Sequence, residues 1–348
     1  MLRNIQALRA IAAYLVVMSH AAGLLKVAGL GVRPIDIGAA GVDIFFVISG
    51  FIMVHTTRDR AVTPQSFMRN RIVRIVPLYW LVTFAVFAGA VVMPRMFNST
   101  TGDIAELLKS LFFIPYLKGS ANIQPVVYVG WTLNYEMFFY AIFALSLFFA
   151  QRRITIVIGA LALLVALRPL AGSVVARFYT DPILLEFAAG MLLARNYDRL
   201  PAKGGAAVLA LGVAALLSVP WVFPQLILWG PGAGEQGWIH RAWIYGIPAI
   251  LIVGGALMLE RQGRSTGRLL LLGNASYSIY LTHFFVVLAS RKLFEAIGPS
   301  VPLAFVFLAA TFVLVALVGI AVHLYVEKTA MDLINRAFKL RRPKLAAT

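Results

Sequence analysis

Long apolar segments, bounded by charged or Gly/Pro-rich stretches, recur along the whole chain. A helix needs about 20 predominantly apolar residues to cross a bilayer, and ten segments approach that length. They lie near residues 6–24, 38–55, 74–93, 127–149, 154–170, 180–195, 204–222, 240–259, 269–289 and 302–326. This pattern predicts an all-α, polytopic membrane protein of about ten transmembrane helices around an internal polar cavity. In an alternative interpretation, the short segments 154–170 and 180–195 are re-entrant, which leaves about eight or nine spans.

The composition supports a membrane location and argues against a soluble domain. Of the 348 residues, 61% are hydrophobic and 13% are charged, whereas soluble domains have about 45–50% and about 25%. The net charge is +17, but the cations gather at the ends of apolar segments, so no nucleic-acid partner is expected. If the N-terminus lies inside, roughly two thirds of the Lys and Arg residues fall in inside segments, as the positive-inside rule requires. Both termini are therefore predicted to be cytoplasmic.

Two parts are expected, a transmembrane domain over 1–327 and a basic amphipathic tail over 328–348. The tail is predicted to lie on the inner membrane surface, because its apolar residues share one helical face. The first apolar segment also mimics a cleavable signal peptide, since Arg3 and Arg9 precede its apolar run. Retention of this segment as a transmembrane helix is favoured.

The chain contains no cysteine. Disulfides, thiolate metal sites and a cysteine nucleophile are therefore excluded, and no metal site is expected. Any covalent chemistry must use Ser, His or a carboxylate.

Titratable residues inside the predicted spans are the first candidates for chemistry, because such residues normally face a polar cavity or a partner. Arg9 and His20 are eleven residues apart, about 16 Å along a helix, and share a face. Asp43 and Glu136 are predicted at the depth of His20 in the second and fourth spans. A carboxylate on one imidazole nitrogen fixes the tautomer and leaves the other nitrogen to take a proton from an attacking hydroxyl. We therefore predict His20, Asp43 and Glu136 as catalytic; the alternative for Asp43 is a helix cap.

Three arginines, Arg69, Arg71 and Arg74, crowd the entrance of the third span, ahead of Pro77 and Tyr79. Guanidinium groups pair well with phosphate, so this entrance is a candidate phosphate site. The positive-inside rule alone would also place cations here.

Ser276, Tyr280 and His283 form a polar stripe on the ninth span, because they are spaced i, i+4 and i+7. Such a stripe indicates a wet path, although it can also hold helices together. The predicted path is completed by Ser49, Trp131 and Asn134. By contrast, His55, His240 and His323 fall at span ends and are predicted to be interfacial residues without a role.

Together these segments resemble the acyltransferase family 3 membrane proteins, particularly members that acetylate bacterial exopolysaccharides. The resemblance is carried by Leu8–Arg9 with His20, Gly41–Gly50, Arg71–Arg74 with Pro77 and Tyr79, Trp131–Glu136, and Ser276–His283.

The resemblance implies an O-acyltransferase of the bacterial inner membrane. It would move an acyl group, with acetyl expected, from cytoplasmic acyl-CoA to a hydroxyl of an exopolysaccharide or lipid-linked glycan. Acyl-CoA would be a co-substrate, and no cofactor would be permanently bound. His20 would be the catalytic histidine with Arg9 its companion, and acyl-CoA would contact Arg9, Arg69, Arg71, Arg74 and Tyr79. Membrane lipids and the polysaccharide synthesis machinery are the further partners it suggests.

Several alternatives stay open from the sequence. His20 could act as general base or as nucleophile, so direct transfer and an acyl-enzyme are both compatible with the pattern. A glycan or lipid transporter or flippase would also need intramembrane charges, but it favours an inverted repeat that we do not find between the two halves. A structural subunit of a polysaccharide synthase would tolerate replacement of His20.

Overall fold

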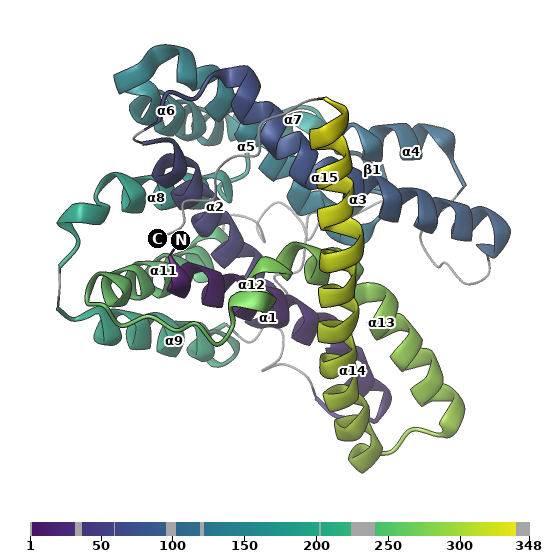
Figure 1. Cartoon of the computed structure of the whole chain (residues 1–348). Coiled ribbons are helices and arrows are strands. Elements are labelled where there is room, and N and C mark those ends of the chain that lie inside the picture. Colours follow the sequence, from purple (N-terminus) through teal and green to yellow (C-terminus); the bar gives the residue numbers. More distant parts are fainter. Residues whose placement is uncertain are drawn as a thin grey trace. The chain divides into compact units, whose positions relative to one another are not determined.

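The computed structural model describes residues 2–31, 37–58, 60–94, 102–118, 122–201, 203–223 and 241–338 (Figure 1). Within these ranges the chain is almost entirely helical, and its strands are the short antiparallel pair β1 (Leu117–Lys118) and β2 (Asn122–Ile123). The predicted all-α class is therefore confirmed. The chain divides into two compact units, and α2 (Ala40–Thr57) contributes to both, with unit 2 beginning at Ser49.

Unit 1 is built from both ends of the sequence, Met1–Ile48, Tyr197–Ile227 and Ile244–Thr348. Besides the start of α2, its elements are α1 (Arg3–Val27), η6 (Tyr197–Arg199), α9 (Gly205–Val222), α11 (Gly246–Arg261), α12 (Leu270–Asn274), α13 (Ser276–Ile297), α14 (Val301–Ala321), the π-helical turn η7 (Val322–Glu327) and α15 (Lys328–Ala337).

Unit 2 comprises Ser49–Asn196 and Leu228–Trp243. Besides the end of α2 and the two strands, its elements are α3 (Pro64–Val92), α4 (Ile104–Leu111), η3 (Tyr128–Gly130), α5 (Trp131–Ser146), η4 (Leu147–Arg152), α6 (Arg153–Ala166), η5 (Arg168–Leu170), α7 (Val174–Tyr179) and α8 (Leu184–Arg195).

Seven helical stretches of the described residues are long and apolar enough to cross a membrane. They are Arg3–Val27, Ile37–Thr57, Pro64–Val92, Tyr128–Phe149, Gly205–Val222, Arg241–Arg261 and Val301–Ala337. Each matches a predicted segment, but the count of about ten and the internal cavity are not confirmed. The predicted segments 154–170 and 180–195 fall on α6 and α8, which have 14 and 12 residues. At 1.5 Å per residue they span only about 18–21 Å, less than the hydrocarbon core of about 30 Å.

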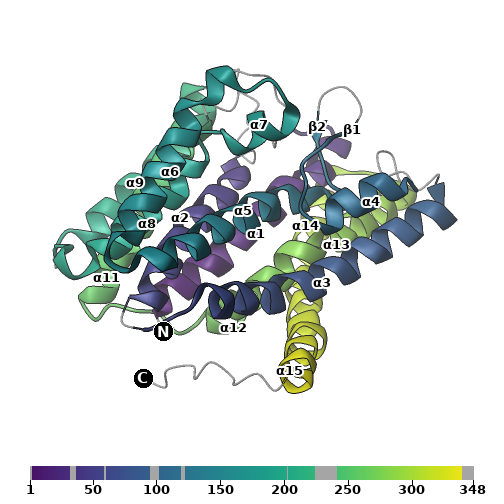
Figure 2. The same ribbon diagram turned by 90° about the horizontal axis from the view of Figure 1, so that it is seen from above.

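Helices α9 and α11 of unit 1 pack through small residues and lie side by side in Figures 1 and 2. A Cβ added at Gly255 would lie 2.5 Å from the Leu209 nitrogen, and one at Gly212 would lie 2.9 Å from the Ile252 nitrogen. Because lipid is as apolar as leucine, membrane helices gain stability from such close backbone approach.

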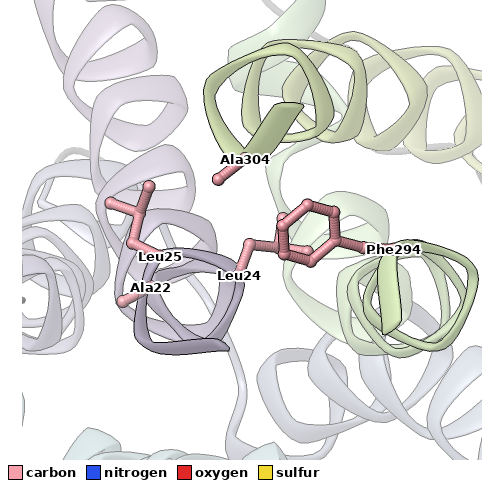
Figure 3. Close-up of a cluster of buried hydrophobic side chains, with 5 residues drawn as sticks. All are labelled: Ala22, Leu24, Leu25, Phe294 and Ala304. Atoms are coloured by element: carbon pink, nitrogen blue, oxygen red, sulfur yellow. The ribbon is translucent and has the colours of Figure 1, made fainter. Parts of the chain in front are cut away.

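The centre of unit 1 is formed by α1, α13 and α14. Near the C-terminal end of α1, Leu24 packs with Phe294 of α13 and Ala304 of α14, and all three are buried (Figure 3). Closer to its middle, α1 packs against the start of α13 through Ala13 and Ile279. These contacts hold α1 along α13, and they bring the polar faces of the two helices together.

The first turn of α1 is capped by a residue far along the chain. The Glu260 carboxylate accepts hydrogen bonds from the backbone N–H of Arg3 at 2.9 Å and of Asn4 at 2.6 Å. The Asn4 side chain donates to the carbonyl oxygens of Ala256 and Arg264, at 3.2 and 2.8 Å. A helix start leaves its first N–H groups without intrahelical partners and attracts negative charge, so α11 stabilises the beginning of α1.

Helix α14 continues through η7 into α15 without a break, and Val301–Ala337 counts 37 residues. Its length of about 55 Å exceeds the hydrocarbon thickness of about 30 Å, and Figure 1 shows it as one continuous yellow-green to yellow rod. The predicted tail thus begins as a helical extension of α14. Its residues 339–348 lie outside the described residues, and its location on the membrane surface stays a prediction.

Candidate functional site

Two imidazoles from distant parts of the chain meet in unit 1. His20 lies on α1 and His283 on α13, and Nδ1 of His20 is 3.3 Å from Nε2 of His283. Their ring centroids are 4.9 Å apart and the rings are inclined at 60°. His283 is fully buried and His20 is half-buried. The structure therefore joins the predicted catalytic histidine to a residue predicted to line the substrate path.

Two backbone carbonyls fix the tautomers of this pair. Nδ1 of His283 lies 2.7 Å from the Tyr280 carbonyl oxygen, and Nδ1 of His20 lies 2.9 Å from that of Val16. A carbonyl oxygen only accepts, so both Nδ1 atoms must carry the hydrogen. Nε2 of His283 is then an acceptor, and the Nδ1–H of His20 is shared between it and Val16. In the neutral ring, the lone pair of His20 is therefore on Nε2, which is the nitrogen that can take a proton.

The start of α2 lies directly against α1 and buries Asp43 completely. A Cβ added at Gly41 would lie 2.2 Å from the Ala12 carbonyl oxygen, and one at Gly38 would lie 2.2 Å from that of Leu15. Glycine is thus required for this approach. A hydrogen bond between Asp43 and His20 stays a prediction.

The predicted polar stripe of α13 is buried in the same unit. Tyr280 packs edge-on against Phe45 with ring centroids 5.9 Å apart. Ser276 is fully buried, and its hydroxyl has no hydrogen-bond partner among the described residues. Arg9 is half-buried on α1, about 16 Å along the axis from His20. A buried hydroxyl without a partner costs about 1–3 kcal/mol, so a polar ligand or water would be favoured near Ser276.

In unit 2, Glu136 is the centre of a second polar cluster. It accepts a short hydrogen bond from the Tyr140 hydroxyl and another from Ser49 Oγ at 3.3 Å. The Arg71 guanidinium lies over the rings of Tyr140 and Phe67, 5.7 and 5.3 Å from their centroids. One predicted catalytic residue, one path residue and one predicted acyl-CoA ligand are thus brought together. The convergence of Glu136 with His20 stays a prediction, because the two residues belong to different units.

The remaining predicted donor-site residues lie along α3. Arg69 is exposed and Arg74 is half-buried. Tyr79 is fully buried about 12 Å along the helix from Arg71. Its hydroxyl donates to the Ser110 carbonyl at 3.2 Å, and its ring stacks on Phe113 with centroids 5.0 Å apart. The described contacts of Tyr79 hold the turn after α4, and its role in acyl-CoA binding stays a prediction.

The path residues Trp131 and Asn134 lie one turn apart on α5 and are both buried. The Asn134 side-chain oxygen has no hydrogen-bond partner among the described residues. The guanidinium of Arg241, which the sequence analysis missed, lies 5.8 Å from the Trp131 ring centroid. Its position at the edge of an apolar segment, 240–259, was the available signal.

A third polar cluster, also missed, joins α13 to η7. Glu327 accepts hydrogen bonds from the Ser278 hydroxyl at 2.6 Å and from His323 Nδ1 at 2.8 Å. His323 is buried and bonded to Glu327, a contact that the sequence analysis did not predict, and its interfacial position stays a prediction. The i, i+4 spacing from Glu327 was the missed signal. His55 is half-buried and stacks on Phe51 with ring centroids 5.2 Å apart. His240 lies outside the described residues.

Comparison with known proteins shows similarity over nearly the whole chain. A family model described as "Acyltransferase domain" matches residues 2–321. The exopolysaccharide production protein ExoZ of Rhizobium meliloti is 40% identical over 298 residues, which cover 84% of this chain and 89% of that protein. BcsY of Komagataeibacter xylinus is 28% identical over 369 residues, covering 99% and 87%. The acyltransferase MdmB of Streptomyces mycarofaciens is 26% identical over 351 residues, covering 89% and 84%. No solved structure gives a significant match.

Proposed function

Since this chain belongs to the acyltransferase family whose model matches residues 2–321, we propose that it moves an acyl group from acyl-CoA to a sugar hydroxyl. Acetyl is the expected acyl group, and the acceptor is an exopolysaccharide or a lipid-linked glycan. The similarity to a protein named for exopolysaccharide production supports the class of acceptor. The protein acts in the bacterial inner membrane with both termini cytoplasmic, which the distribution of its cations supports.

The pair of His20 and His283 is the observation that carries this proposal. Nε2 of His20 takes the proton of the sugar hydroxyl while the sugar oxygen attacks the thioester carbonyl. The C–S bond breaks, the acyl group stays on the sugar, and the imidazolium returns its proton to the leaving thiolate to give free CoA. His283 supports the imidazolium because its Nε2 accepts from the His20 Nδ1–H. An acyl-enzyme would use the same nitrogen as nucleophile, and it would be trapped as acyl-His20 in the absence of acceptor.

Donor binding is assigned to the arginines of α3 and to Arg9. Arg69 and Arg74 retain solvent exposure and can pair with CoA phosphates, whereas Arg71 is engaged with the rings over which it lies. Glu136 and Asp43 are proposed to complete the reacting centre. The acceptor sugar is assigned to the surroundings of Trp131 and Asn134, with Ser49, Ser276 and Tyr280 along the path.

The proposal is tested with purified protein, labelled acyl-CoA and a glycan acceptor, by following labelled glycan and free CoA thiol together. We expect both from the wild-type protein and neither from His20→Ala, because removal of a general base costs about 10²–10⁴ in rate. His55→Ala is the matched control, because this histidine of unit 2 stacks on Phe51 and is assigned no role in the proposed reaction. Full transfer by His20→Ala would refute the catalytic assignment. Glycan movement across vesicles without acyl transfer would establish the transporter alternative.

A further inference from the structure

The cluster of Ser278, Glu327 and His323 is a buried link between α13 and the π-helical turn η7. One carboxylate oxygen, Oε2 of Glu327, accepts from Ser278 at 2.6 Å and from His323 at 2.8 Å. Each of the three residues is less than a tenth exposed. Hydrogen bonds to a charged group in such a place are stronger than neutral ones, and breaking one leaves a buried polar group unpaired.

This link and the pair of imidazoles use opposite sides of α13. Ser278 and His283 are five residues apart, so at 100° per residue their side chains point about 140° apart around the helix. The Glu327 carboxylate therefore holds the back of the helix whose front presents His283 to His20. A rotation of α13 about its own axis therefore displaces the Ser278 and His283 side chains together.

The π turn determines where Glu327 lies. A π turn holds one residue more than an α-helical turn, and such turns occur frequently at functional sites. Within the turn, Tyr325 is 75% exposed, whereas His323 and Glu327 are buried. Just before this turn, α14 lies against α13 so closely that a Cβ on Gly319 would be 2.3 Å from Ile279 Cγ1. With the two helices fixed at this point, the turn sets the direction of the Glu327 side chain towards Ser278.

We infer that the bond between Glu327 and Ser278 is a latch that sets the rotation of α13 and so holds His283 on Nδ1 of His20. Glu327 and Ser278 are positioning residues for the acyl transfer, and this inference rests on the proposed function. A side-chain atom about 6 Å from the helix axis moves by about 2 Å when the helix rotates by about 20°. Such a shift is enough to break the 3.3 Å contact between the two imidazoles.

The first test measures coupling between the latch and His283. Glu327→Ala and Ser278→Ala should each lower kcat about tenfold with the KM for acyl-CoA unchanged, and Glu327→Gln should keep most activity because its amide oxygen still accepts from Ser278. In a His283→Ala background, Glu327→Ala should cause no further loss, since residues acting through one another are not additive. An equal loss in both backgrounds would overturn the latch.

The control on the same helix is Glu295→Ala, which removes an exposed ion pair with Arg291 at 2.8 Å and should leave kcat unchanged. A second test does not depend on activity and uses the absence of native cysteine. In a His20→Cys/His283→Cys protein, cross-linking by a short bifunctional thiol reagent should fall severalfold when Glu327→Ala is added. Unchanged cross-linking would refute the latch even if acyl transfer were confirmed. Inactive wild-type protein with latch-dependent cross-linking would refute only the proposed function.

Discussion

Replacing His283 by alanine removes the imidazole that accepts from the Nδ1–H of His20. The expected effect follows from the geometry of the pair. When His20 takes a proton, the 3.3 Å contact becomes a charge-assisted hydrogen bond, which contributes about 1.5–3 kcal/mol. The same Nδ1–H also lies 2.9 Å from the Val16 carbonyl, which remains in the variant, so the loss should be near the lower value. We therefore expect kcat to fall about tenfold, since about 1.4 kcal/mol corresponds to a factor of ten.

The assay is release of CoA thiol at saturating glycan, with His20→Ala measured beside it as the reference for loss of the base. His283→Gln is the informative companion, because its side-chain oxygen can accept from Nδ1 of His20 and should restore part of the rate. Two results would refute the reasoning. An unchanged kcat in folded His283→Ala would show that the contact does not support the imidazolium. A loss as large as that of His20→Ala would indicate that His283 is itself the proton acceptor.

Three further predictions concern other parts of the molecule. Arg69→Ala should raise the KM for acyl-CoA about 10- to 100-fold through loss of charge-assisted phosphate contacts. The control Arg177→Ala, at another exposed arginine, should leave this KM unchanged. Equal KM values for both variants would show that the arginines of α3 only set membrane topology and do not bind the donor. Gly255→Leu should separate α9 from α11 and lower the thermal unfolding temperature, because even a Cβ there would lie 2.5 Å from Leu209 N; Gly159→Leu, whose Cβ would meet nothing within 4 Å, is the control, and an equal decrease in both would contradict the packing argument. Burial raises the pKa of Tyr116, in the segment between α4 and α5, to about 12, so the free energy of unfolding should decrease as pH rises from about 10 to about 12; Tyr116→Phe should flatten that slope, and an unchanged slope would assign it to other groups.

The hydrophobic pattern predicted the helices better than it predicted their partners. Long apolar segments such as 6–24 and 302–326 were predicted correctly as helices, because about 20 apolar residues are enough for a helix to cross the hydrocarbon core. The short segments 154–170 and 180–195 were counted as spans with re-entry as the alternative, but the helices that form there, α6 and α8, have only 14 and 12 residues. An apolar run of that length fits a buried helix as well as a membrane one, so composition alone could not decide between them. Helix α4 was not predicted at all, since its eight residues carry charge between two spans.

Within the candidate site, sequence reasoning selected His20 and His283 separately but expected a carboxylate to orient His20. Helical periodicity places residues on a face of their own helix, and it carries no information about a partner 263 residues away. The backbone carbonyl of Val16 that fixes the tautomer has no sequence signal, because every residue supplies one. The link between Glu327 and His323 did have a local signal in its i, i+4 spacing, but a π turn cannot be recognised from residue types alone.

The cap that Glu260 places on α1 has a consequence for how the protein is made. Glu260 lies 257 residues after Arg3, and ribosomes add about 5–20 residues per second, so α1 emerges roughly 13 to 50 s before its cap exists. During that interval unit 2, which is contained in the middle of the sequence, can be inserted, while unit 1 still awaits its C-terminal half. We therefore expect biogenesis to end when α11 and the helices after it pack against α1. Fusion partners placed directly before Arg3 would interfere with that last step, because the capped N–H groups begin there.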